Sequence, residues 1–82
     1  MGTTREEISG WFERGVAHGA THMIVVCDTF DWDDYPVFVK ADEQVADRVK
    51  AFDGVNMQKI MEIYNLSMDR DDQLAQHRAY NL

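Results

Sequence analysis

Cysteine is scarce in this chain, which has a single one, Cys27. One thiol cannot close an internal disulfide, and it cannot supply the paired cysteines of a C-x-x-C metal site. Asp28 follows Cys27 in place of a cation that would favour the thiolate. We therefore expect Cys27 to be a small buried side chain at a strand end, in a protein of a reducing cytoplasm.

Long apolar runs are also missing. The longest strictly apolar stretch is Met23–Cys27, far shorter than the roughly 20 residues that a membrane-spanning helix needs. The first residues do not combine a basic start with an apolar segment, which is the mark of an export signal. We expect no contact with a membrane and a location in the cytoplasm.

Positive charge is outnumbered, with 8 Lys and Arg against 15 Asp and Glu and a formal net charge of -7. Binding of DNA or RNA depends on Lys and Arg that neutralise phosphates, so this excess predicts no direct contact with nucleic acid. The same field attracts basic surfaces, which favours a basic protein or nucleoprotein complex as partner. The alternative is that the charge only keeps the protein dissolved.

The apolar content is sufficient for one folded domain. A chain of 82 residues with 45% hydrophobic side chains predicts a single small acidic domain over residues 1–82. A domain near this size buries only about 60 to 65% of the surface of its unfolded chain, so its stability should be modest. Formation of a homodimer would add to it.

The first half of the chain predicts a helix and a hairpin. Thr4 and Glu7 match a capping box, and apolar residues at helical spacing follow them until Gly19. Residues 21–27 are β-branched and apolar enough for a central strand. A second strand covers Val37–Val39, and Pro36 at its start favours an edge position. The connection 28–35 is short enough for an antiparallel hairpin.

The second half of the chain predicts short helices. Asp42 is placed to cap a helix that carries Val45, Ala46, Val49 and Phe52 and ends at Gly54. Asn56 is placed to cap a second helix over 57–64, and residues 67–82 leave room for a last helical turn. The predicted fold class is α+β, with an N-terminal helix, an antiparallel β-hairpin and then two or three short helices packed on the sheet.

The most unusual segment is acidic and aromatic. Its aspartates crowd together with no cation between Arg14 and Lys40, and they lack the spacing of an EF-hand calcium loop. In extended backbone, Asp31 and Asp33 would project to one side about 7 Å apart, as adjacent phosphates do. Aromatic residues alternate with them, either as interface anchors or as a cap on the sheet end. The predicted partner-binding residues are Asp28, Asp31, Trp32, Asp33, Asp34 and Tyr35.

No other residues predict catalysis or a cofactor. The imidazoles are His18, His22 and His77, and the first two lie on either side of the expected helix end, which spoils a metal-ligand geometry. The motifs of nucleotide-binding loops, serine hydrolases and zinc peptidases are missing. We predict no enzymatic activity, no cofactor and no metal. Met57, Met61 and Met68 form either a pliable docking surface or core filler.

Four segments carry a family resemblance: 19–31 (GATHMIVVCDTFD), 34–37 (DYPV), 56–62 (NMQKIME) and 77–82 (HRAYNL). With them the chain resembles, over nearly its whole length, a family of small proteins carried by bacteriophages and prophages. Small acidic phage proteins include anti-CRISPR inhibitors, many of which bind a CRISPR effector complex and obstruct its contact with target DNA. Such complexes hold nucleic acid in positively charged channels, which agrees with the charge of this chain.

Three functions follow as expectations. The resemblance and the charge favour an inhibitor or adaptor that binds a basic protein surface in the bacterial host cytoplasm, in its concrete form an anti-CRISPR protein. The alternative is a structural or assembly accessory protein that forms a homodimer through methionine-rich helices. A small metal-dependent hydrolase is the third, and it requires a bound ion.

Overall fold

A three-stranded antiparallel sheet forms the centre of the structure, a computed structural model that describes residues 4–55, 57–76 and 79–82. Its strands are β1 (His22–Asp28), β2 (Asp33–Val39) and β3 (Gln58–Asn65), in the order β2-β1-β3. The helices are α1 (Arg5–Ala17), α2 (Val45–Phe52) and α3 (Arg70–Leu74). The predicted α+β class, with a first helix, a hairpin and short later helices, is confirmed.

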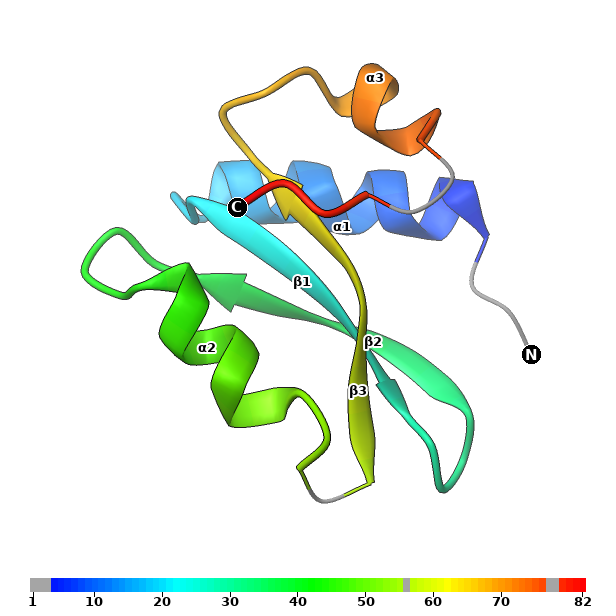
Figure 1. The fold of residues 1–82 in the computed structure, drawn as a ribbon. Helices are drawn as coiled ribbons and strands as arrows, with labels where there is room; N and C mark the ends of the chain where they lie inside the picture. Colours follow the sequence, from blue (N-terminus) through cyan, green and yellow to red (C-terminus); the bar gives the residue numbers. More distant parts are fainter. Residues whose placement is uncertain (1–3, 56, 77–78) are drawn as a thin grey trace.

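Helices cover both faces of the sheet. Figure 1 shows α1 and α3 on one side and α2 on the other. Because successive residues of β1 point to opposite faces, Met23 and Val25 pack towards α1, and Ile24 and Val26 pack towards α2. The uninterrupted apolar run at the start of β1 is therefore buried on both sides, as a central strand requires.

The first helix begins and ends as the sequence predicts. The Thr4 hydroxyl accepts a hydrogen bond of 3.1 Å from the Glu7 backbone N–H, which satisfies one of the unpaired donors of the first turn. Gly19, at φ +75°, turns the chain out of the helix. A side chain at Gly15 would bring its Cβ within 2.8 Å of Leu66 and 2.9 Å of Phe38, so this glycine allows the helix to lie close to the sheet.

The α2 helix is present, but its predicted cap is wrong. The N-cap residue is Gln44, which makes no side-chain cap hydrogen bond. Asp42 lies before it, exposed in a turn, and this turn is closed instead by the Lys40 N–H, which donates to Glu43 Oε1 at 2.9 Å. Three of the predicted apolar positions of this helix, Val45, Val49 and Phe52, pack on the sheet, whereas Ala46 is exposed.

The helix predicted over 57–64 is wrong, because this segment forms β3. Asn56, its predicted cap, lies outside the described residues. The register between β1 and β3 shifts between Val25 and Val26. This irregularity places Ile60 and Ile63 on the α2 face, and Met61 and Tyr64 on the α1 face. Apolar residues three apart thus share a face of a strand, which imitates the spacing of a helix.

The C-terminal segment covers the outer edge of β3 at its C-terminal half. The Ile63 N–H donates to the Ala79 carbonyl at 2.9 Å, and the Asn81 N–H donates to the Ile63 carbonyl at 3.0 Å. Tyr80 forms an isolated parallel bridge with Ile63. At the end of the strand, the buried Gln73 side chain accepts from Asn65 N–H at 2.8 Å and donates to the Asn65 carbonyl at 2.9 Å. The expected last helical turn is α3, which carries this glutamine.

The structure also bears on the membrane prediction. In the described ranges, no helix combines the length and the apolar character needed to cross a bilayer.

His22 gives a prediction about pH. Its Nδ1 lies 3.0 Å from Thr21 Oγ1, its buried Nε2 has no partner among the described residues, and burial lowers its pKa. The imidazole of the unfolded chain then binds a proton more readily than that of the folded chain. His22 therefore does not reduce the stability of the fold above the unfolded pKa near 6.5, and the fold loses stability as the pH falls from there through the lowered pKa of the folded state.

We expect the free energy of unfolding of the wild type to fall more steeply between about pH 7 and pH 5 than that of a His22→Gln variant. Urea denaturation at both pH values measures the difference, since the carboxylates common to both proteins contribute equally. Parallel pH profiles would show that His22 carries no such penalty.

Candidate functional site

The six residues predicted to bind a partner gather at one end of the β1–β2 hairpin. Asp28 ends β1, and Asp33, Asp34 and Tyr35 begin β2, so the turn itself is only 29–32. In the register of the hairpin, Asp28 lies opposite Asp33, and Cys27 lies opposite Asp34. The predicted segment is therefore mostly strand, and its side chains point to both faces of the sheet.

The turn is held by Asp28. Its carbonyl accepts a hydrogen bond of 2.6 Å from the Trp32 N–H, and its carboxylate accepts one of 2.9 Å from the Phe30 N–H. Trp32 takes a left-handed backbone conformation, with φ 59°, which is unusual for a residue other than glycine. Since Asp31 lies in this turn, the prediction that it projects beside Asp33 from an extended backbone is wrong.

The aspartates differ in their surroundings. Asp31 and Asp33 are exposed, whereas Asp28 and Asp34 are half-buried. Asp34 hydrogen-bonds the Cys27 thiol, whose pKa is raised first by burial and then by this contact. Cys27 is buried at the end of β1, as expected. Hence only Asp31 and Asp33 present their carboxylates openly to solvent.

The aromatic residues of the hairpin also differ in their exposure to solvent. Phe30 is 72% exposed and Trp32 is 58% exposed. Tyr35 is half-buried against the α2 face, and its hydroxyl accepts a hydrogen bond of 2.6 Å from Gln58 Nε2. Two of the three rings are therefore available for contact, and the third belongs largely to the packing of the sheet.

A second turn adds apolar surface that sequence reasoning missed. Thr29 donates to the Met57 carbonyl from its N–H at 2.7 Å and from its hydroxyl at 2.6 Å, so the α2–β3 connection lies beside the hairpin turn. Val55 is 40% exposed and Met57 is 57% exposed. We call the exposed side chains of these two turns the tip patch: Phe30, Trp32, Val55 and Met57. The contribution of Val55 and Met57 could not be predicted, because the two turns meet only once β3 is recognised as a strand.

The tip patch also contains backbone strain. Trp32 and Met57 are the non-glycine residues with positive φ in the described part of the chain, at 59° and 61°. Such conformations cost of the order of 1 kcal/mol or more and tend to occur at functional sites. Their position on the two adjoining turns is consistent with a surface that is shaped for contact.

The charge around the tip patch remains negative. Lys59, on β3, places its ammonium 5.7 Å from the centre of the Trp32 ring, in the geometry of a cation–π contact. The ion pairs of the described residues join other groups, such as Arg5 with Glu62 and Arg48 with Glu43. The exposed carboxylates of Asp31 and Asp33 thus flank the aromatic rings without an ion pair of their own in this part of the structure.

Other chemistry finds little support in the geometry. Over residues 4–55, 57–76 and 79–82, no three His, Cys, Asp or Glu side chains are grouped closely enough to hold a metal ion. His77 lies outside the described residues. The methionines do not form one surface either, because Met57 precedes β3, Met68 follows it, and Met61 packs towards α1.

Comparisons with known proteins give no further guide. No family model, curated protein or solved structure matches the chain.

Proposed function

We propose that this protein is a non-enzymatic inhibitor or adaptor that binds a basic protein surface through the tip patch. The observation that carries the proposal is the exposure of Phe30 and Trp32 beside the exposed carboxylates of Asp31 and Asp33. Exposed aromatic side chains supply much of the binding energy in protein interfaces, and a complementary charge speeds encounter. The concrete form is an anti-CRISPR protein of the bacterial host cytoplasm that occupies a positively charged nucleic-acid channel.

The tip patch and the two exposed carboxylates beside it, Asp31 and Asp33, divide these tasks. Phe30 and Trp32 would enter apolar or aliphatic surface of the partner, while Asp31 and Asp33 would meet its Lys and Arg. Asp28 and Asp34 have structural partners inside the chain, so in this proposal they position the turn and Tyr35 supports it. The net charge of -7 keeps the whole molecule attracted to a basic surface.

The proposal predicts a salt-dependent loss of binding in an Asp31→Asn/Asp33→Asn variant. A basic complex captured from a bacterial lysate at low salt is purified, and its affinity for the wild type and the variant is measured across ionic strengths. We expect the variant to bind about tenfold more weakly at low salt, because it loses two charges that steer and hold the partner.

The matched control is Asp42→Asn/Asp47→Asn, which removes the same charge from exposed positions before and within α2. It should bind nearly as well as the wild type. If the two double variants lose affinity equally, net charge alone accounts for the attraction; if neither loses affinity, the tip patch is not the contact.

The homodimeric accessory role has less to support it. The helix that was to bring Met57 and Met61 together is a strand in the structure. Light scattering after size exclusion separates this alternative from the first, because it requires a stable dimer that Met57→Gln would dissociate.

A further inference from the structure

A pocket lies between α1 and α3, away from the hairpin. Its volume is about 280 Å³, and it is lined by Phe12, Glu13 and Val16 of α1 and by Asp69, Arg70 and Asp71 at the start of α3. Both helix segments adjoin the sheet end where β1 begins and β3 ends, whereas the tip patch lies where β1 ends. The pocket is thus a surface separate from the tip patch.

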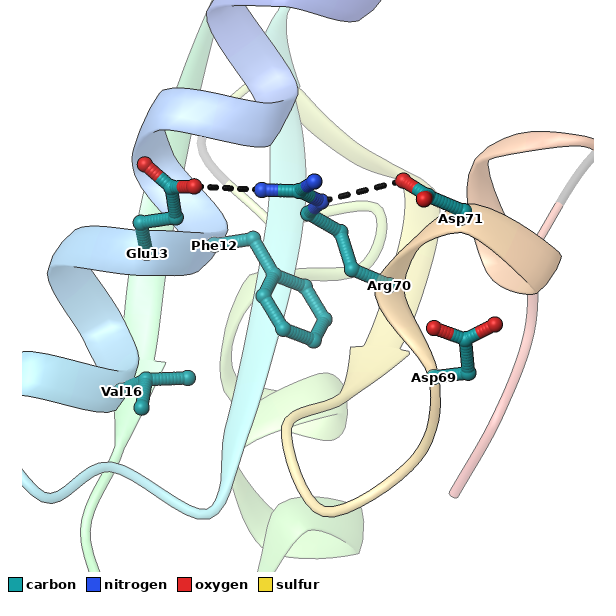
Figure 2. A pocket seen from close by; sticks show the side chains of 6 residues that line it. All are labelled: Phe12, Glu13, Val16, Asp69, Arg70 and Asp71. Atoms are coloured by element: carbon teal, nitrogen blue, oxygen red, sulfur yellow. Dashed lines mark hydrogen bonds and ion pairs between the residues drawn. The ribbon is translucent and has the colours of Figure 1, made fainter.

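Arg70 lines this pocket and makes two ion pairs there. Its guanidinium is paired with Glu13 across the gap and with Asp71 Oδ1 at 3.2 Å, as Figure 2 shows. Asp71 and, more weakly, Glu13 raise the pKa of Arg70. Because this cation is held between two carboxylates, it ties α3 to α1 and its charge is already balanced.

The third carboxylate of the pocket lining belongs to Asp69. It occupies the N-cap position of α3 yet makes no side-chain cap hydrogen bond, although aspartate at this position usually does. Its side chain lines the pocket instead, and in Figure 2 it stands beside the ring of Phe12 with Val16 on the other side. Among the described residues, the ion pairs do not include it.

The lining therefore combines an apolar floor with an excess of negative charge. Phe12 is 5% exposed and Val16 is 52% exposed, and three carboxylates face a single guanidinium. Lys and Arg side chains have this double character, with an aliphatic stem and a charged head that reaches a polar rim.

We propose that this pocket receives a basic side chain, Lys or Arg, from a protein partner. The stem lies on Phe12 and Val16, and the charged head reaches Asp69. An acidic side chain would meet the repulsion of the three carboxylates, and a neutral aliphatic one would gain only the apolar contact.

The test is a titration of the isotope-labelled protein, followed by two-dimensional NMR, with Nα-acetyl-lysine methylamide as the probe. Its arginine counterpart, the neutral norleucine counterpart and the acidic glutamate counterpart are titrated in parallel. We expect the two basic probes to shift the amide signals of Phe12, Val16 and Asp69, with norleucine much weaker and glutamate without effect. In Asp69→Asn the basic probes should bind about fivefold more weakly, the upper range for a solvent-accessible ion pair.

Asp72→Asn is the matched control, since Asp72 is an exposed carboxylate of α3 that does not line the pocket. It should leave the affinity of the lysine probe nearly unchanged. The proposal is overturned if norleucine shifts these signals as strongly as lysine, if the basic probes leave them unmoved, or if the two variants lose the same affinity.

Discussion

Replacing Gln73 by methionine should lower the free energy of unfolding by about 3 kcal/mol, because two backbone groups of Asn65 would lose their partners. The Gln73 side chain is fully buried. It accepts from the Asn65 N–H at 2.8 Å and donates to the Asn65 carbonyl at 2.9 Å, as a neighbouring strand would. Methionine has a similar volume, so the change isolates these hydrogen bonds from packing.

Further contacts add to the expected effect. Asn81 Nδ2 donates to Gln73 Oε1 at 3.0 Å, and Gln73 Nε2 also donates to the Asp69 carbonyl at 3.1 Å. One side chain thus joins the end of β3, the start of α3 and the C-terminal segment. Its loss should loosen all three together.

Urea denaturation measures this loss, and hydrogen exchange of the Asn65 amide reports it locally. Gln44→Met is the control, because Gln44 is exposed and its side chain makes no cap hydrogen bond; it should change stability by less than about 0.5 kcal/mol. Equal stabilities of the Gln73 and Gln44 variants would mean that water replaces the glutamine without cost.

Removal of Arg5 should destabilise the fold by about 2 kcal/mol, because it leaves the charge of Glu62 buried without its counter-ion. Glu62 is 8% exposed. Arg5 donates to its two carboxylate oxygens at 3.3 and 3.2 Å, and the Ala79 N–H donates to Oε2 at 3.2 Å. The Arg5 side chain is itself 48% exposed, so water can replace part of the interaction and the cost stays below that of a fully buried pair.

Tyr64 completes this cluster. Its hydroxyl accepts from Arg5 at 3.0 Å and donates to Glu62 at 3.1 Å, and burial followed by the charge of Glu62 raises its pKa. The phenol therefore stays protonated and supports the carboxylate. Through these groups, the first turn of α1 is fastened to β3 and to the chain that leaves α3.

A double variant distinguishes loss of charge balance from loss of packing. Arg5→Met costs the full amount, whereas Arg5→Met/Glu62→Gln should recover most of it, since the glutamine oxygen still accepts from Ala79 and no charge remains buried. Chemical denaturation at neutral pH provides the measurement, with Arg14→Met as the control at an exposed position of α1. Equal costs for the single and double variants would assign the effect to the lost arginine stem.

Local signals predicted the elements that depend on neighbours in sequence. The Thr4 cap, the Gly19 stop and the apolar run before Cys27 are readable because a hydroxyl, a positive φ or a β-branched run acts within a few residues. The hairpin follows from the same information. Its turn is shorter than expected, since Asp33, Asp34 and Tyr35 can pair with β1 despite their polarity.

The features that depend on contacts between distant segments of the chain could not be predicted from the sequence. The register shift opposite Val25 gave β3 the apolar spacing of a helix, and no local feature reveals such a shift. The tip patch was only half predicted for the same reason, because the α2–β3 connection is joined to the hairpin turn through Thr29 and Met57. Whether Phe30 and Trp32 would be buried or exposed also depended on what lay beside them. The role of Gln73 gave no sequence signal, since a glutamine usually lies at the surface.

The hydrogen bonds along the outer edge of β3 limit how another chain can add a strand to this sheet. Strand addition needs a row of free N–H and C=O groups, and on β3 Ala79, Asn81 and Gln73 already bond Ile63 and Asn65. On the opposite margin, Pro36 lies within β2 and has no N–H to offer. Addition of a partner strand is thereby disfavoured at the C-terminal half of β3 and at Pro36 of β2, as is edge-to-edge association of two molecules at these positions. At these positions a neighbouring molecule can make side-chain contacts more readily than backbone hydrogen bonds.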